Sequence, residues 1–318
     1  MNEIPTNFNN FDIIGDIHGH SNDLKKLLGA LGYKLKGNYY HHPERKVLFL
    51  GDYIDRGVNV VEVLEIVKNM VDNGQAIALM GNHEYNAICY NTLTEDGTYL
   101  REHSKKNFNQ HAITMAAFMQ KPNLYKMYVE WFKTLPLFYE NDTFRAIHAC
   151  WDQDSVTYLK TRFPNHCLNS AVLEEASTTG TALYEALEII LKGKELDLPN
   201  NQSFIDKDGI IRHSFRVKWW EKPQLPPTLH SISASVIKHQ ANDAIDIQHL
   251  NFYPPTDKPV FFGHYWMKVQ TGGQPQILTP NTCCLDYSVA KNGHLVCYRY
   301  SGEQQLDSAS INYIKEYN

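Results

Sequence analysis

The chain has 318 residues, of which 43% are hydrophobic and 20% are charged, and its formal net charge is −5 with a pI near 6.3. This composition is typical of a soluble globular protein of one or two domains. Lysine and arginine are scattered, which argues against a nucleic acid or a membrane held by a broad basic surface. No apolar run approaches the ~18 residues of a transmembrane helix, and the polar first ten residues are unlike a signal peptide, so we expect a cytoplasmic protein.

Short apolar runs alternate with helical periodicity over the first 80 residues. Buried strands are predicted at 11–14, 46–50 and 76–80, and each runs into a glycine. Between them, apolar residues spaced i, i+3, i+4 and i+7 predict helices that begin near Ser21 and Asn59. The order strand–helix–strand–helix–strand predicts a parallel sheet, and ligands of such α/β sheets bind at the carboxyl ends of the strands.

Further elements are expected later in the chain. A helical stretch at 99–133 is followed by apolar strands at 144–147 and 259–262, each of which precedes a histidine. The Lys-Asn-Gly sequence at 291–293 lies between two strand-like segments, which predicts a β-hairpin.

Residues 152–258 have a different character. They contain one predicted helix, near 182–191, and loops rich in asparagine and proline, with a hairpin turn predicted at Asp208-Gly209. We interpret 152–258 as an insert or cap region within a catalytic domain formed by 1–151 and 259–318. Because the insert lies between two strands that end at histidines, we expect it to overhang the site and to control substrate choice.

Three motifs place metal-binding side chains just after predicted strands: GDIHG at 15–19, GDYIDRG at 51–57 and GNHE at 81–84. Two divalent cations need oxygen and imidazole ligands and one carboxylate that bridges them. The candidate ligands all follow a strand; they are Asp16, His18, Asp52, Asn82, His148 and His264. Asp52 is the natural bridging ligand. A glycine precedes four of the six, and we expect it to let the backbone turn sharply beside an ion.

The other polar residues of these motifs suit phosphate chemistry. Two cations ~3.5–4 Å apart can clamp a phosphoryl group and lower the pKa of a shared water. Arg56 offers a planar fork for two phosphate oxygens. His83 can protonate the leaving oxygen, and Asp55 is placed to hydrogen-bond the ring of His83 and favour its charged form.

In this order, with His148 and His264 following, the three motifs resemble those of the calcineurin-like metallophosphoesterases. The closest resemblance is to the phosphoprotein phosphatase branch in its bacterial form, and it covers 11–90, 143–151 and 259–300. It implies an α/β fold in which a β-sandwich is flanked by helices, here with an inserted cap region.

The resemblance also implies roles for individual residues. One metal is held by the residues that match Asp16, His18 and Asp52. The other is held by the residues that match Asp52, Asn82, His148 and His264. The matches to Asp55 and His83 form the acid dyad, and the match to Arg56 binds phosphate. The cofactor it implies is a pair of divalent metal ions, with Mn²⁺ expected first and iron, zinc, nickel and cobalt as alternatives.

The substrate is specified less closely than the metals. Family members of the phosphoprotein branch have two glycines after the histidine that matches His148, whereas this chain has Ala149 and Cys150. We expect a phosphatase that hydrolyses phosphomonoesters, phosphoproteins among them, and the alternative is a dinucleoside polyphosphate hydrolase. An inactive binding module is disfavoured, because a dead copy would be free to lose ligands. Arg212 and Arg216 are candidates for a second phosphate-binding arginine.

Several other residues are better explained by structure than by chemistry. We interpret Glu84 as a structural hydrogen-bond acceptor and Asp286 as a turn or network residue of the last hairpin. His103 and His111, eight apart on the predicted helix, are interpreted as cap or surface residues rather than ligands. We do not expect Cys150 to be a nucleophile. Trp219-Trp220 is interpreted as part of the hydrophobic core.

Overall fold

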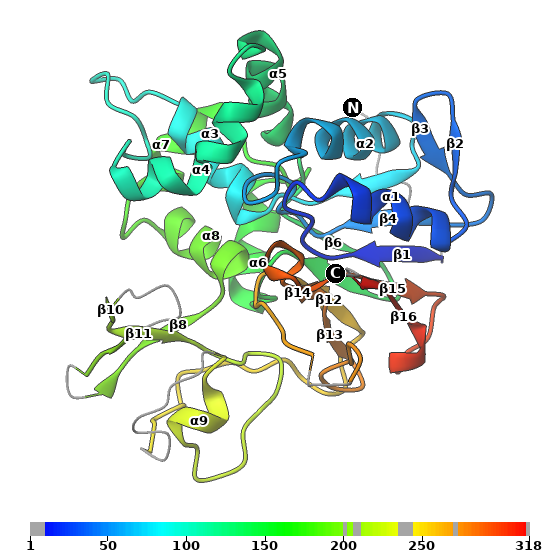
Figure 1. Cartoon of the computed structure of the whole chain (residues 1–318). Coiled ribbons are helices and arrows are strands. Elements are labelled where there is room, and N and C mark those ends of the chain that lie inside the picture. The colour runs from blue at the N-terminus through cyan, green and yellow to red at the C-terminus, as the bar shows by residue number, and fades with distance from the viewer. Residues whose placement is uncertain (1–9, 200–201, 206–210, 235–243, 270–272, 316–318) are drawn as a thin grey trace.

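The computed structural model of the chain describes residues 10–199, 202–205, 211–234, 244–269 and 273–315. Two mixed β-sheets pack face to face, helices cover their outer faces, and a group of short strands extends from one end (Figure 1). The hairpin turn predicted at Asp208-Gly209 lies outside the described residues. Within the described ranges, no helix has the length and apolar character needed to cross a bilayer.

The first sheet contains the three strands predicted near the N-terminus: β1 (Phe11–Ile14), β4 (Lys46–Phe49) and β5 (Ala76–Ala78). β1 pairs parallel to β4, and β4 pairs parallel to β5, which confirms the predicted arrangement. On its other side β1 pairs antiparallel to a group of C-terminal strands, β14 (Asp286–Tyr287), β15 (His294–Tyr300) and β16 (Ile311–Lys315). β14 and β15 form the hairpin predicted around 291–293.

The second sheet has the order β13-β12-β7-β6. Its strands are β6 (Phe138–Glu140), β7 (Arg145–Ile147), β12 (Val260–Phe262) and β13 (Thr282–Cys284). β7 and β12 are neighbours and run parallel although more than a hundred residues separate them in the chain. Both strands therefore end at the same edge of the sheet.

A hydrophobic core fills the space between the two sheets. Phe11 and Ile13 of β1 pack here against Phe144 and Phe261 from the second sheet, and all four are fully buried. The next residue, Ile14, belongs instead to the core beneath the helices. Because both faces of each central strand are covered, these strands are largely apolar, and the buried Asp12 of β1 is neutralised by Arg45, whose Nε donates to it at 2.9 Å. The β-sandwich flanked by helices that the sequence implied is confirmed.

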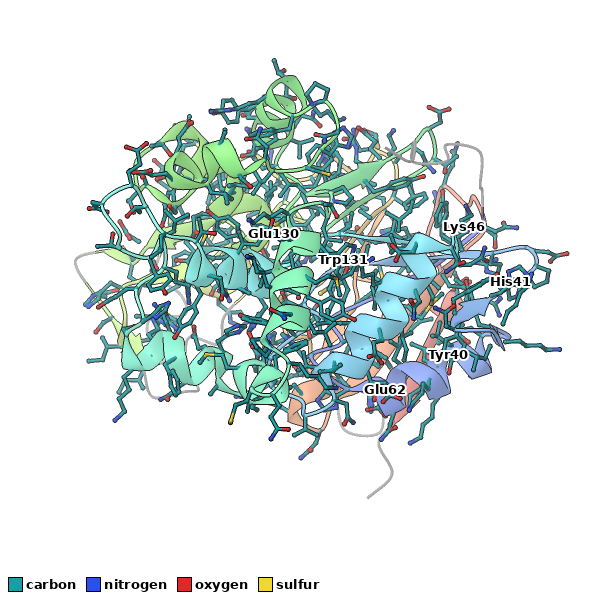
Figure 2. The ribbon with its side chains drawn as sticks, turned by 90° about the horizontal axis from the view of Figure 1, so that it is seen from above. Tyr40, His41, Lys46, Glu62, Glu130 and Trp131 are labelled. Carbon is teal, nitrogen blue, oxygen red and sulfur yellow. The ribbon has the colours of Figure 1, made fainter. Side chains whose placement is uncertain are left out.

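Helices cover the outer face of the first sheet. α1 (Ser21–Ala30) and α2 (Val60–Asp72) begin at or next to the predicted residues, and α3 (Asn82–Asn91) begins within GNHE. The helical stretch predicted at 99–133 is confirmed from 105 onwards but is broken in two, because the chain forms α4 (Lys105–Phe118) and then α5 (Pro122–Phe132). Pro122 separates them, since proline disrupts a continuing helix but suits a first turn. Lys68 of α2 lies over the Trp131 ring of α5, and both helices lie on the same face (Figure 2).

The stretch 152–258 contains two kinds of structure. Its first part forms α6 (Gln153–Arg162), α7 (Leu173–Ser177) and α8 (Ala182–Lys192), which pack in the main core, and α8 confirms the helix predicted at 182–191. Its second part has short elements: β8 (Glu195–Asp197), β9 (Phe204–Ile205), β10 (Ile211–Arg212), β11 (Ser214–Arg216) and α9 (Leu229–Ile232). These surround a separate small core of Leu198, Phe215, Val217, Leu229 and Ile232. We call residues 193–252 the cap. A further hairpin, β2 (Lys34–Lys36) and β3 (Tyr39–His41), lies beyond α1.

Candidate metal centre

Both sheets contribute strand ends to one buried site. The loops that follow β1, β4 and β5 carry Asp16, Asp52 and Asn82, while His148 and His264 come directly after β7 and just beyond β12. The side chains of these five residues are all at most 9% exposed. The parallel pairing within each sheet therefore gathers residues that lie far apart in the sequence.

Asp52 lies between two groups of buried side chains. His18 Nε2 is 3.5 Å from Asp52 Oδ2, and His83 Nε2 is 3.9 Å from the same oxygen. On the other side, His148 Nε2 is 3.5 Å from Asp52 Oδ1, and His264 belongs to this second group. The two oxygens of one carboxylate thus face two separate groups of possible ligands, which is the geometry that a bridging ligand needs.

Asn82 and Asp16 lie beside the same groups. Asn82 Oδ1 is 3.0 Å from His148 Nε2 and 2.9 Å from His264 Nδ1. The backbone N–H of His264 lies 3.3 Å from each carboxylate oxygen of Asp16. The structure therefore brings all six predicted ligands together.

The donor atoms fit cations. Nδ1 of His18 is 2.9 Å from the carbonyl oxygen of Ile54, and Nδ1 of His148 is 2.8 Å from that of Leu50. Each Nδ1 therefore carries the proton, and each Nε2 presents a lone pair to the site. His148 Nε2 and Asn82 Oδ1 are then two lone-pair donors 3.0 Å apart, an arrangement that a cation stabilises. His18 Nε2 is buried without a hydrogen-bond partner among the described residues.

The electrostatics of the same groups point to a cation as well. Burial, followed by the charges of Asp286 and Asp52, raises the pKa of Asp16 well above its ordinary value. Burial lowers the pKa of His18 to about 3. A divalent cation favours an ionised carboxylate and a neutral imidazole, which are the forms that bind metal. The residues present thus suit the divalent ions that the motifs imply.

The backbone at these loops is held in the left-handed region. The φ angle is +45° at His18, +54° at Asp52 and +68° at His264, and it is +65° at Asp55 and +69° at Arg56. Residues other than glycine rarely adopt this backbone region, and those that do cluster at functional sites. The hydrogen bonds and packing around the loops maintain these conformations.

The glycines that precede the ligands have two different roles. Gly51 has a φ of +106°, as a sharp turn requires. At Gly81 and Gly263 the reason is space instead, because an added Cβ would lie 2.3 Å from Asp52 Oδ1 and 2.1 Å from Asp16 Oδ1 respectively. At Gly15 an added Cβ would lie 2.1 Å from the carbonyl oxygen of Leu285. The expectation that a turn explains each of these glycines is therefore wrong for Gly15, Gly81 and Gly263.

His83 and Asp55 form the predicted pair. His83 Nδ1 lies 2.5 Å from Asp55 Oδ2, so Nδ1 donates to the carboxylate. Burial lowers the pKa of His83, but the carboxylates of Asp52 and Asp55 outweigh it and raise this pKa above its ordinary value. His83 Nε2 faces the pocket, 3.5 Å from Nη2 of Arg56. The ring is thus oriented to exchange its Nε2 proton with a bound group.

Arg56 reaches the pocket from the loop that also carries Asp55. Its guanidinium lies 4.0 Å from the centroid of the Trp266 ring, and Nζ of Lys291 lies 4.9 Å from that centroid. Such cation–π contacts hold a charged group in place while leaving its N–H donors available. Trp266, two residues after His264, was not singled out by the sequence analysis.

Two buried acids maintain the loops, as predicted. Glu84 accepts the backbone N–H groups of Asp52 and Tyr53, each at 2.8 Å, and that of Gly81 at 3.0 Å. Burial, followed by the charge of Asp52, raises the pKa of Glu84 to about 8. Asp286 accepts the N–H of Trp266 at 2.8 Å. Both residues act within the fold.

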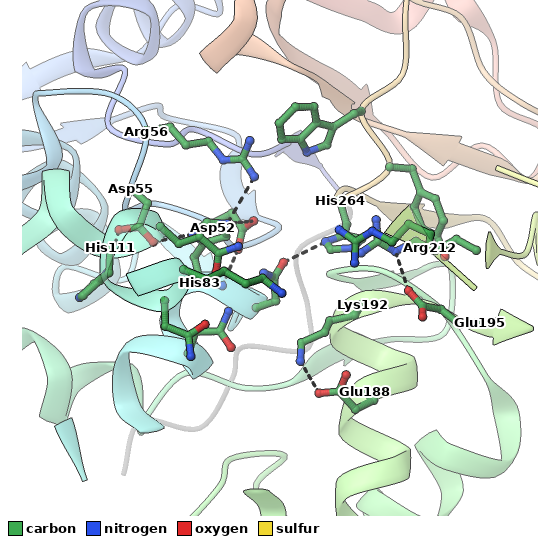
Figure 3. A pocket seen from close by; sticks show the side chains of 18 of the residues that line it. Asp52, Asp55, Arg56, His83, His111, Glu188, Lys192, Glu195, Arg212 and His264 are labelled. Atoms are coloured by element: carbon green, nitrogen blue, oxygen red, sulfur yellow. Dashed lines mark hydrogen bonds and ion pairs between the residues drawn. The ribbon is translucent and has the colours of Figure 1, made fainter. Parts of the chain in front are cut away.

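A cavity of about 870 Å³ opens next to the motif residues (Figure 3). Asp52, Asn82, His83 and Arg56 line one side, and the cap and α8 line the other. The basic residues along it outnumber the acidic ones; they are Arg56, Arg101, Lys106, Lys192, Arg212, Arg216, Lys268 and Lys291, against Asp52, Asp55, Glu188 and Glu195. This excess of positive charge suits a polyanionic ligand.

Arg212 and Arg216 both line this cavity. They lie on β10 and β11, and Arg212 is seen across the pocket from Arg56 (Figure 3). Nε of Arg216 is 3.7 Å from Oε1 of Glu195. The insert thus overhangs the motif residues, and it presents both candidate arginines to the pocket.

Of the residues that were predicted to have structural rather than chemical roles, some predictions are confirmed and one is wrong. Trp219 and Trp220 are buried in the core, as predicted. Burial raises the pKa of Cys150, which fits an inert thiol. The surface interpretation of His111 is wrong, because its side chain is buried and contacts Asp55. No signal in the local sequence identifies this contact, because Asp55 lies 56 positions away from His111.

Comparisons with known proteins bear on the family and on the substrate class. The family model described as calcineurin-like phosphoesterase matches residues 10–264. Two curated relatives, from Halalkalibacterium halodurans and Oceanobacillus iheyensis, are named bis(5'-nucleosyl)-tetraphosphatase PrpE [asymmetrical]. They are 45% identical over 74 residues and 42% identical over 73 residues. Each match spans 23% of this chain but only 30% and 29% of the respective relatives.

The fold is also found in a solved structure. A cold-active protein-tyrosine phosphatase of a psychrophilic Shewanella aligns with a TM-score of 0.50 and 16% identity, over 99% of this chain and 85% of that chain. At this level of identity the similarity concerns the fold.

Proposed function

Because this chain belongs to the calcineurin-like phosphoesterase family, we propose that it is a metal-dependent hydrolase whose preferred substrate is a dinucleoside polyphosphate. Membership of the family makes it a phosphoric ester hydrolase and implies divalent metal ions. The narrower substrate class is supported by the tetraphosphatase names of the two curated relatives. These names favour the alternative raised by the sequence analysis over the phosphomonoester.

The six predicted ligands are proposed to hold two divalent ions, with Asp52 between them. Such a pair, when bound, supplies positive charge to the phosphoryl oxygens and lowers the pKa of a nearby water. Mn²⁺ is the metal we propose, because oxygen and imidazole ligands suit it. Among the described residues, Nε2 of buried His18 has no hydrogen-bond partner and faces the Asp52 carboxylate at 3.5 Å, and this is the observation that most directly supports a metal there.

The protein's own residues are proposed to orient the substrate and deliver a proton. Arg56 binds two oxygens of the reacting phosphoryl group, with its guanidinium held against Trp266. Water loses a proton to solvent as its oxygen adds to phosphorus, the bond to the leaving oxygen breaks, and His83 gives its Nε2 proton to that oxygen and later regains one from solvent. Asp55 accepts the Nδ1–H of His83 throughout and stabilises the charged ring before transfer.

The cap is proposed to select the substrate. A dinucleoside polyphosphate is long and carries several negative charges, and the cavity of about 870 Å³ with its excess of basic residues suits both properties. Arg212 and Arg216 would contact phosphates beyond the one that reacts. The division into a catalytic domain (1–151 and 259–318) and an insert (152–258) is part of this proposal.

A substrate panel tests the proposal. Purified protein loaded with Mn²⁺ is assayed on a diadenosine tetraphosphate, a phosphoserine peptide and a phosphodiester. We expect the highest kcat/KM on the tetraphosphate, with one nucleoside triphosphate and one nucleoside monophosphate as products, and loss of activity with a chelator. A higher kcat/KM on the phosphopeptide would overturn the substrate assignment while leaving the chemistry in place.

A phosphomonoester remains the second candidate. The order of GDIHG, GDYIDRG and GNHE is the feature that favours it, because it resembles the phosphoprotein phosphatase branch. The same panel distinguishes the two candidates. Hydrolysis of none of the substrates at any metal loading would support the inactive binding module instead.

A further inference from the structure

A second histidine contacts the carboxylate that holds the proposed acid. His111 of α4 is 5% exposed, and its Nδ1 lies 2.8 Å from Asp55 Oδ1. The other oxygen, Oδ2, contacts His83 Nδ1 at 2.5 Å. Asp55 therefore lies between two imidazoles, each of which contacts one of its oxygens (Figure 3).

The contacts of His111 continue away from the pocket. The hydroxyl of Tyr125 lies 2.6 Å from His111 Nε2, and Nδ2 of Asn91 donates to that hydroxyl at 2.8 Å. Since Asn91 donates to the Tyr125 oxygen, the tyrosine proton is directed to His111 Nε2. The proton of the neutral His111 ring then lies on Nδ1, the atom that faces Asp55.

Thr114, nearly one helical turn after His111, contacts the same residue twice. Its Oγ1 donates to Asp55 Oδ1 at 2.6 Å and accepts the backbone N–H of Asp55 at 2.9 Å. Helix α4 thus satisfies one carboxylate oxygen completely and directs the other to His83. Burial would raise the pKa of Asp55, but hydrogen bonds from His111 and His83 lower it well below its ordinary value.

We propose that His111 is a positioning residue for the reaction, which fixes the Asp55 carboxylate and, through it, the ring of His83 in the orientation needed for proton delivery. This inference rests on the proposed role of His83 as the acid. A residue that only fills the core would affect every substrate equally. A residue that orients the acid affects most strongly the substrates whose leaving groups need a proton.

The test uses a series of phenyl phosphates with leaving groups of increasing pKa. His111→Leu removes the donor to Asp55, His111→Asn keeps an N–H at the Nδ1 position, and Tyr125→Phe removes only the outer hydroxyl. His103→Leu is the matched control, because His103 contacts the backbone oxygen of Tyr90 and does not line the cavity. Thermal unfolding of each metal-loaded variant is measured alongside the kinetics.

We expect His111→Leu to lower kcat about 10-fold for the poorest leaving group, less than the ~10²–10⁴-fold typical of an entire general acid. The loss should shrink towards the nitrophenyl ester, with KM little changed. His111→Asn should recover most of the lost rate, and Tyr125→Phe should give a smaller loss with the same dependence.

Different results overturn different assignments. Equal losses across the series, or no rescue by His111→Asn in a folded variant, would overturn the positioning role. If His111→Leu does not fold, the test rests on Tyr125→Phe. Wild-type kinetics of that variant on every phenyl phosphate would also overturn the positioning role. An inactive wild-type protein, or a His83→Asn variant without leaving-group dependence, would instead overturn the proposed function on which this inference rests.

Discussion

The motif loops and the cap face each other across one cavity, but they are supported very differently. Each motif loop follows a strand buried on both faces, and Glu84 alone accepts four backbone N–H groups from them. The cap has strands of two or three residues around its own small core. Reaction chemistry needs atoms held within fractions of an ångström, whereas recognition of a long anion tolerates more variation. The difference suggests that the loops determine the reaction and the cap determines the substrate.

The largest effect is expected at the centre of the loops. Asp52→Asn should abolish detectable hydrolysis of every substrate and weaken binding of both metals, because one carboxylate faces both groups of ligands. Metal content after dialysis, measured by elemental analysis, checks this. Two tightly held ions per chain in the variant would show that Asp52 is not the bridging ligand.

The next effect concerns the acid. His83→Asn should slow hydrolysis of a phosphoserine peptide by ~10²–10⁴-fold and that of p-nitrophenyl phosphate much less, because a stable leaving group needs little protonation. Asp55→Asn should show the same selectivity in milder form. Metal content should be unchanged in both. Equal losses in kcat/KM on the two substrates would mean that His83 serves another purpose.

A smaller effect is expected in the cap. Arg212→Ala and Arg216→Ala should each lower kcat/KM for a diadenosine tetraphosphate about 10-fold, as expected for the loss of one charge-assisted hydrogen bond of ~1.5 kcal/mol. A small aryl phosphate should be hydrolysed as by the wild type. Lys218→Ala is a suitable control, because Lys218 lies in the cap but does not line the cavity. Wild-type kinetics of both arginine variants on both substrates would place the arginines outside the binding site.

The smallest effect concerns how the insert is attached. Glu140 of β6 pairs with Arg145 at 2.8 Å and with two lysines of the insert, Lys160 and Lys258. Burial raises the pKa of Glu140, but these partners outweigh it and lower the pKa to about 2. A lowered folded-state pKa stabilises the fold above the unfolded value of ~4.3, and this contribution is lost as the pH falls towards 2.

Glu140→Gln should therefore lower the free energy of unfolding at pH 7 by about 1 kcal/mol, allowing for solvent screening, and by less near pH 2.5. Urea unfolding of metal-free protein at the two pH values measures the difference. A destabilisation of the same size at both would show that the contribution of Glu140 does not depend on its charge.

Local sequence was sufficient to predict the site residues that follow strands. It was not sufficient to predict the site residues that reach the metal centre from other elements, such as the helices and the cap. Asp16, Asp52 and Asn82 could be placed because short buried strands and the glycines beside them are local features. His111 could not, because its partner Asp55 lies 56 positions away and the predicted helix ran through the break at Pro122. Nor does periodicity reveal elements as short as those of the cap.

The most direct test of the division between loops and cap is the ratio of kcat/KM for a diadenosine tetraphosphate to that for phenyl phosphate. It is measured for metal-loaded wild type and for an Arg212→Ala/Arg216→Ala double variant whose metal content is verified. We expect this ratio to fall substantially in the double variant while kcat/KM for phenyl phosphate and the metal content stay at wild-type values. An unchanged ratio, or an equal fall on both substrates, would contradict it.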